Sequence, residues 1–129
     1  MRASPALRVL VVDDCPDNRD SLGLLLWAWG HEVRLAHDGP SALEAYPAFH
    51  PQAVLLDLGL PGMDGYEVAR RIRQQDGGGA VLLVALSGLG REEDKARSRE
   101  AGFDAHLTKP ADPQELQRLL AGVAAVGAA

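Results

Sequence analysis

The sequence predicts a doubly wound α/β fold built on a parallel sheet, and three observations carry this prediction. Strand-like and helix-like stretches alternate five times along the 129 residues. Three of the strand-like stretches, VLVV, AVLL and VLLVAL, are continuous apolar runs, as in strands that helices cover on both faces. No linker or low-complexity segment interrupts the alternation. We therefore expect a single domain over residues 1–129, with a core of about residues 7–123.

The first two strand-and-helix units follow from apolar runs and turn residues. RVLVVD, residues 8–13, is typical of a buried strand, and SLGLLLWAWG, residues 21–30, is typical of a helix that ends at a glycine. EVRLAH, residues 32–37, alternates as a half-buried strand does. SALEAY, residues 41–46, predicts a short helix that Pro47 stops.

The last three units repeat the pattern. Apolar runs predict the strands, and helical spacing with terminal glycines, prolines and charges predicts the helices. The predicted strands are 53–57, 80–87 and 105–108, and the predicted helices are 65–75, 91–102 and 113–126. In the last helix, Leu116, Leu119, Leu120 and Val123 share one face, and the tail from Gly127 is expected to fray.

Some polar and aromatic residues have plain structural interpretations. Asp64 is expected to cap the helix that follows it. Trp27 and Trp29 are expected to pack within the fold. His31, His37 and His50 have no metal-ligand spacing and are expected at the surface or in turns.

Composition and charge exclude several function classes. The formal net charge is −5, and the basic run Arg70 to Arg73 is too short to form a nucleic-acid or anionic-membrane surface. The longest apolar run is about half the length that a bilayer crossing needs. Cys15 is the single cysteine, so no internal disulfide can form, and a reducing cytoplasmic location is expected.

Reactive or charged side chains follow four of the five predicted strands. They are Asp13 and Asp14 after the first strand, Asp57 at the third, Ser87 at the fourth and Lys109 after the fifth. Ligands of doubly wound sheets bind beyond the carboxyl ends of the strands. We therefore expect these side chains to meet at one edge of the sheet.

Three neighbouring carboxylates repel one another unless a cation lies among them. Oxygen ligands favour Mg²⁺, whose two charges, together with that of Lys109, balance the three aspartates. Open metal positions can accept a phosphoryl group that Ser87 and Lys109 also reach, which predicts a phosphoryl-transfer site. Asp57 is the best candidate nucleophile because it stands alone at the end of the central strand.

The motifs at these strand ends resemble the receiver domain of two-component response regulators over essentially the whole chain. They are VVDD at Asp13 and Asp14, LLDLGLPGMDGYE around Asp57, ALSG at Ser87 and LTKP at Lys109. The resemblance implies a flavodoxin-like (βα)5 three-layer sandwich with strand order 2-1-3-4-5. It also implies a signalling domain rather than an enzyme. Such a domain catalyses only its own phosphorylation and dephosphorylation.

The resemblance assigns roles to individual residues. Asp57 would accept a phosphoryl group from a phosphohistidine of a sensor histidine kinase or a histidine phosphotransfer protein. Asp14, Asp57 and the backbone carbonyl of Gly59 would ligate Mg²⁺, and Asp13 would act through water. The Lys109-Pro110 bond would be cis.

Two positions depart from the usual receiver pattern. His106 stands where receivers usually carry Tyr or Phe, the ring that moves inward when the Ser87 hydroxyl moves onto the phosphoryl group. The alternative interpretation is that His106 takes no part in the switch and is simply exposed on an edge strand. Gly59 places no side chain over the phosphorylation site, which would let attacking water approach. Its backbone carbonyl is unaffected.

Other functions stay open at this point. Asp13 could simply cap the following helix. A phosphohydrolase of the haloacid-dehalogenase type would need a second aspartate at the position of Gly59, and a docking scaffold would have lost the chemistry.

No effector domain follows the fifth helix, so we expect either a stand-alone docking protein or the receiver of a hybrid sensor kinase. A monomer, or a weak phosphorylation-dependent dimer, is expected.

Overall fold

The computed structural model describes residues 6–75, 78–88 and 92–128, and a parallel five-stranded sheet lies at their centre. The strand order is β2-β1-β3-β4-β5, which confirms the predicted order and fold class. The strands are β1 Arg8–Val12, β2 Glu32–Ala36, β3 Ala53–Asp57, β4 Leu82–Ser87 and β5 Ala105–Thr108. The helices are α1 Pro16–Ala28, α2 Gly39–Phe49, α3 Gly65–Arg73, α4 Glu92–Ala101 and α5 Pro113–Ala128, with a short 3₁₀ turn at Gly78–Ala80.

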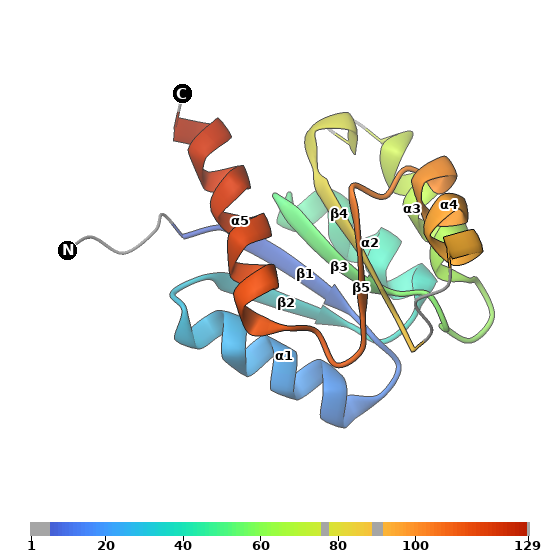
Figure 1. Cartoon of the computed structure of the whole chain (residues 1–129), viewed down its shortest axis with the longest axis horizontal. Helices are drawn as coiled ribbons and strands as arrows, with labels where there is room; N and C mark the ends of the chain where they lie inside the picture. Colours follow the sequence, from blue (N-terminus) through green and yellow to red (C-terminus); the bar gives the residue numbers. More distant parts are fainter. Residues whose placement is uncertain (1–5, 76–77, 89–91, 129) are drawn as a thin grey trace.

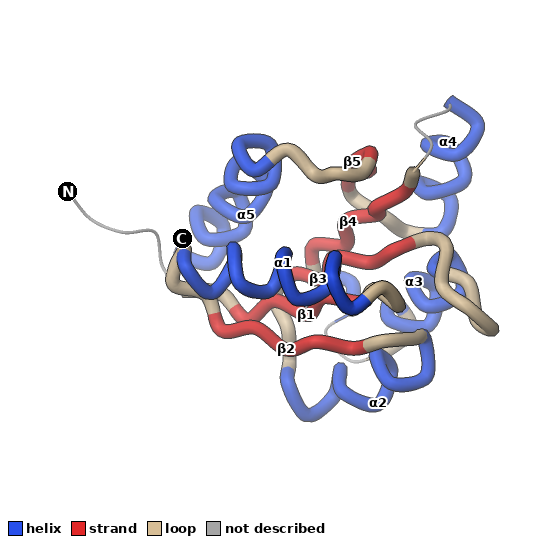
Figure 2. Tube along the Cα trace, turned by 90° about the horizontal axis from the view of Figure 1, so that it is seen from below, coloured by secondary structure: helices blue, strands red, loops and turns tan. Residues whose placement is uncertain are grey.

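Helices cover both faces of the sheet (Figures 1 and 2). Alternate residues of the central strands enter two separate apolar clusters, because successive side chains of a strand point to opposite faces. Leu10, Val54 and Leu83 pack on the side of α2 and α3. Val9 and Leu55 pack on the side of α1 and α5, where Leu116 and Leu120 are buried. The chain therefore forms the predicted three layers.

The second helix contradicts the sequence prediction at both ends. Asp38 and Ser41 form a reciprocal capping box, so α2 begins at Gly39. Pro47 lies inside α2, which continues to Phe49 and ends at His50 in the left-handed conformation, with φ of 52°. Pro47 removes one hydrogen bond of the helix, and the burial of its neighbours Tyr46 and Phe49 in the core offsets this cost.

Several other boundaries differ by a few residues. The first helix begins at Pro16, a favoured first helical position, rather than at residue 21. Ala80 belongs to the 3₁₀ turn rather than to β4. The last helix runs to Ala128, beyond the predicted end at residue 126, while the predicted helix start at Arg91 and the final Ala129 lie outside the described residues.

The structure contradicts one of the plain structural interpretations, that of Trp27. The Trp27 side chain lies in solvent, with 68% of the residue exposed, because it projects from the outer face of α1, whereas Trp29 packs against the core as predicted. His31 lies in the turn between α1 and β2, one of the two expected places, but it is buried there, and its Nδ1 accepts a hydrogen bond from the Leu7 backbone N–H at 3.1 Å. The cap at Asp64 is confirmed, since its Oδ1 accepts from Glu67 N–H at 2.9 Å.

Candidate functional site

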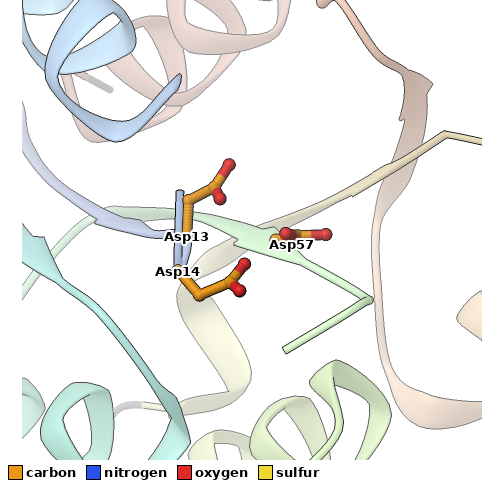
Figure 3. A group of neighbouring side chains, drawn as sticks. All are labelled: Asp13, Asp14 and Asp57. Carbon is orange, nitrogen blue, oxygen red and sulfur yellow. The ribbon is translucent and has the colours of Figure 1, made fainter. Parts of the chain in front are cut away.

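Three aspartates meet where β1 and β3 end at the same edge of the sheet (Figure 3). Asp13 and Asp14 directly follow β1, and Asp57 is the last residue of β3. One carboxylate oxygen from each lies within 4.8 Å of the others. Asp13 and Asp57 are buried and Asp14 is exposed, so the cluster opens to solvent on the Asp14 side.

The position of Asp57 follows from the sheet order. Its strand is central, and the apolar run before it is fully buried between the two helical layers. The Asp57 Oδ1 atom accepts a hydrogen bond from the Gly59 N–H at 2.9 Å, which fixes the carboxylate on one side. Its Oδ2 atom lies 3.0 Å from Lys109 Nζ on the other. The carboxylate is held in one orientation by groups from two different strand ends.

Lys109 links two of the aspartates. Its Nζ lies 3.2 Å from Asp13 Oδ2 as well as 3.0 Å from Asp57 Oδ2. Burial acts to lower the pKa of Lys109, but its hydrogen bonds and charge interactions with Asp57 and Asp13 outweigh burial and raise the pKa. The ammonium group therefore stays charged beside the carboxylates. The Lys109-Pro110 bond is cis, as predicted.

The turn that carries Asp13 and Asp14 is held from two sides. The Asp13 Oδ1 atom accepts a hydrogen bond from Cys15 N–H at 2.9 Å, and the Asp13 carbonyl accepts one from Arg19 Nη1 at 3.2 Å. Cys15 is the N-cap of α1 and has no side-chain capping bond. Asp13 therefore does not cap the helix, and that alternative is wrong.

Ser87 ends β4, one residue beyond the position that pairs with Asp57. Its Oγ lies 2.7 Å from Nε2 of His106, and Nδ1 of the same ring lies 3.0 Å from Oγ of Ser98 on α4. His106 is half-buried, and both of its ring nitrogens have hydrogen-bond partners. His106 therefore lies on an edge strand but is not simply exposed, so the exposure expected in the alternative interpretation is wrong.

The donor set fits a hard divalent cation. The three carboxylates supply only oxygen atoms, and Lys109 provides one positive charge against their three negative charges. The cluster therefore stays net negative and attracts a cation such as Mg²⁺, which commonly takes one or two carboxylates as ligands and keeps several waters. The open side at Asp14 leaves room for those waters and for a phosphoryl group.

Three residues near the site were not singled out from the sequence. Arg19 and Ser98 make the side-chain contacts described above, and Gly65 begins α3 so close to β3 that a Cβ there would lie 2.7 Å from the Asp57 carbonyl oxygen. Ser98 had one weak signal, as a small uncharged residue in a charged helix. The others had none, because their roles depend on how α1 and α3 approach the sheet.

No helix within residues 6–75, 78–88 and 92–128 is long and apolar enough to span a bilayer.

A family model described as the response regulator receiver domain matches residues 9–121 of the chain. A putative response regulator from Chloroflexus aurantiacus J-10-fl superposes with a TM-score of 0.86 and 34% identity, covering 94% of this chain and 99% of that chain. The receiver domain of sensor histidine kinase PA1611 from Pseudomonas aeruginosa PAO1 superposes with a TM-score of 0.84 and 32% identity, again over 94% and 99%. That structure has a magnesium ion coordinated in its active site cleft.

A curated relative of different length is the sensor histidine kinase RcsC of Escherichia coli K12. It is 38% identical over 104 residues, which are 81% of this chain but 11% of RcsC. The likeness therefore concerns one segment of a much longer protein.

Proposed function

Because the chain belongs to the response regulator receiver family, whose members are the phosphoacceptor domains of two-component signalling, we propose that Asp57 is its phosphoacceptor residue. The observation that carries the proposal is the placement of Asp57. It is the one carboxylate of the cluster that ends the central strand, with Gly59 N–H on one oxygen and Lys109 on the other. The donor is a phosphohistidine of a sensor histidine kinase or a histidine phosphotransfer protein.

The transfer forms one bond and breaks one. A carboxylate oxygen of Asp57 attacks phosphorus, the bond between phosphorus and the donor imidazole nitrogen breaks, and that nitrogen keeps the electron pair. Positioning and electrostatics carry most of such a reaction. Lys109 lies where it can neutralise charge on the phosphoryl oxygens, and the Gly59 N–H holds the Asp57 carboxylate in place.

Mg²⁺ would be held by Asp14, Asp57 and the Gly59 carbonyl, with Asp13 acting through water. When bound, it supplies positive charge that neutralises the phosphoryl oxygens. The clustering of Asp13, Asp14 and Asp57 within 4.8 Å supports this assignment. Asp13 also orients Lys109 through their 3.2 Å contact.

Further proposals concern the protein as a whole. We propose that residues 1–129 act as one receiver unit that catalyses only its own phosphorylation and dephosphorylation, and that it is a monomer or a weak phosphorylation-dependent dimer. Its signal would pass by docking to protein partners, without direct contact to nucleic acid. A cytoplasmic location and membership in a hybrid kinase remain predictions from the sequence.

Intact mass after treatment with acetyl phosphate and Mg²⁺ tests the phosphoacceptor. We expect a single phosphoryl adduct that hydroxylamine removes, because an acyl phosphate is labile to this nucleophile. Asp57→Asn should abolish the adduct. Asp20→Asn is the matched control, since Asp20 is an exposed aspartate on α1, and it should be modified like the wild type. A hydroxylamine-labile adduct at wild-type level in Asp57→Asn would exclude Asp57.

The same preparation separates the alternatives. Turnover of an external phosphomonoester would favour a phosphohydrolase, although Gly59 occupies the position of the aspartate that such enzymes need. A protein that takes no phosphoryl group and binds no Mg²⁺ would instead be a docking scaffold.

A further inference from the structure

His106 joins two elements that approach the site from different directions. It lies in β5, its Nε2 contacts Ser87 Oγ at 2.7 Å at the end of β4, and its Nδ1 contacts Ser98 Oγ at 3.0 Å on α4. Ser98 is 1% exposed, so this contact lies inside the protein. A continuous path of hydrogen bonds therefore runs from the candidate phosphorylation site to the interior face of α4.

The chemistry of these groups gives the path a direction. A neutral imidazole has one N–H donor and one acceptor nitrogen, whereas a serine hydroxyl can donate and accept. If Ser87 donates a hydrogen bond to Nε2, the ring proton lies on Nδ1, and Ser98 Oγ accepts a hydrogen bond from Nδ1–H. If Ser87 accepts from Nε2–H, Nδ1 must accept the hydrogen bond from Ser98. The two arrangements correspond to the two tautomers of one ring.

We propose that phosphorylation shifts His106 from the Nδ1–H to the Nε2–H tautomer and that Ser98 is the positioning residue through which α4 senses this change. The inference rests on the proposed function. A Ser87 hydroxyl that donates to a phosphoryl oxygen has no second proton to donate, so it can only accept from His106. The ring loses its Nδ1 proton to solvent water and takes a proton from solvent water at Nε2, so the charge of the ring does not change.

The unphosphorylated state favours the opposite direction. A serine within a helix commonly donates its hydroxyl proton to the carbonyl four residues earlier, which leaves its oxygen as an acceptor. Ser98 in that arrangement accepts from Nδ1–H of His106. When the tautomer reverses, Ser98 must turn its proton toward the ring, and the local geometry of α4 changes with it.

Nitrogen NMR of the His106 ring tests the tautomer directly. The protein is compared with Mg²⁺ alone and with Mg²⁺ and beryllofluoride, at about one pH unit above the ordinary histidine pKa. We expect the Nδ1 resonance to move from the protonated to the unprotonated range and Nε2 to move the opposite way. In Ser87→Ala, at a beryllofluoride concentration that saturates the response of the Gly59 amide, the ring nitrogens should not change places.

Backbone amide shifts test Ser98. In the wild type, beryllofluoride should shift the amides of Ser98 to Ala101, and Ser98→Ala should lose this response while the amide of Gly59 still responds. Ser98→Thr keeps a hydroxyl and should restore the α4 response. Ser21→Ala, an exposed serine of α1, is the matched control and should behave like the wild type.

The outcomes separate this inference from the proposed function. A wild-type protein that shows no beryllofluoride response at Gly59 overturns the phosphoacceptor site itself. Bound beryllofluoride with unchanged ring nitrogens, or with both nitrogens protonated in both states, overturns the tautomer change alone. An α4 response in Ser98→Ala equal to that of the wild type overturns the role of Ser98.

Discussion

At the scale of single residues, the site is a balance between the charge of one half-buried lysine and the charges of three carboxylates. Among the described residues, Lys109 pairs with Asp57 and Asp13, whereas Asp14 is the exposed member of the cluster. The two kinds of charge therefore affect a divalent cation in opposite ways. Removing a carboxylate takes away a ligand and a favourable charge, whereas removing Lys109 takes away a repulsive one.

We predict that Asp14→Ala lowers Mg²⁺ affinity by about tenfold or more, which corresponds to about 1.4 kcal/mol of binding free energy. Lys109→Ala should keep or raise the affinity, because cation repulsion is relieved. Isothermal titration calorimetry measures both, with Asp20→Ala as an exposed aspartate outside the cluster for comparison. Equal affinity for the wild type and Asp14→Ala would refute the metal site.

Gly59 lies directly beside the Asp57 carboxylate, to which its N–H donates a hydrogen bond. A Cβ at this position would lie 3.6 Å from Asp57 Oδ1, an ordinary contact distance, so a larger side chain can fit beside the carboxylate. We predict that Gly59→Met lengthens the lifetime of the phosphorylated state several-fold, because the side chain shields the acyl phosphate from water. Loss of radiolabelled phosphate measures it. Gly79→Ala, whose Cβ would meet no atom within 4 Å, should keep the wild-type lifetime.

At the scale of elements, the start of α3 is built against the end of β3. Tyr66, Val68 and Ile72 bury one face of α3 in the core, while Asp64 caps it. Gly65 allows the first turn to approach β3 closely, since a Cβ there would lie 2.9 Å from Leu58 Cα. The close approach sets the path of the residues that follow Asp57.

We predict that Gly65→Ala destabilises the fold by about 1–3 kcal/mol, the usual range for overpacking, and slows phosphorylation by acetyl phosphate. The added methyl group would meet backbone atoms, which cannot move aside as a flexible side chain can. Urea unfolding and mass spectrometry measure the two effects. Gly122→Ala, on an exposed turn of α5 with open space around the new Cβ, should stabilise by up to about 1 kcal/mol. Wild-type stability in Gly65→Ala would show that α3 can shift away from β3.

At the scale of the whole molecule, stability depends on contacts that join distant segments. Arg73 is one example, because its guanidinium donates to the carbonyls of Gly78, Val81 and Gly102 and pairs with Asp104. His31 is another, because it connects the turn after α1 to the residue before β1. Burial lowers the pKa of His31, since the charged ring is less well solvated inside the protein.

This shift makes stability depend on pH. The folded pKa of His31 lies below its ordinary value of 6.5, so between the two values the unfolded chain binds more protons than the folded one. The contribution of His31 is fully present above pH 6.5 and is lost as pH falls toward the folded pKa. We predict that the free energy of unfolding declines over this window and that His31→Asn declines less.

Urea unfolding across that pH window measures the difference, with His37→Asn as the exposed comparison. A decline in His31→Asn as steep as in the wild type would rule out His31 as the source. The amide oxygen of Asn can still accept from Leu7 N–H, so the variant removes the titration and retains a hydrogen-bond acceptor.

Sequence patterns were enough to predict the succession of strands and helices, the single parallel sheet and the side chains at the strand ends. Apolar runs such as AVLL report burial on both faces, and Asp57 follows such a run directly. Local capping was also readable at Asp64, because a cap bonds within its own turn. Most helix boundaries differed from the prediction by a few residues; Pro47, for example, lies inside α2 instead of ending it.

Contacts between residues far apart in the sequence could not be predicted from these patterns. The exposure of Trp27, the burial of His31 and the contact of Ser98 with His106 depend on where α1, the following turn and α4 lie against the sheet. Two side chains of the same type, such as Trp27 and Trp29, can face the solvent and the core respectively, and their local sequence does not tell them apart. The physical reason is that sequence patterns report burial and local hydrogen bonding, whereas a contact between two elements is fixed by the packing of the whole core.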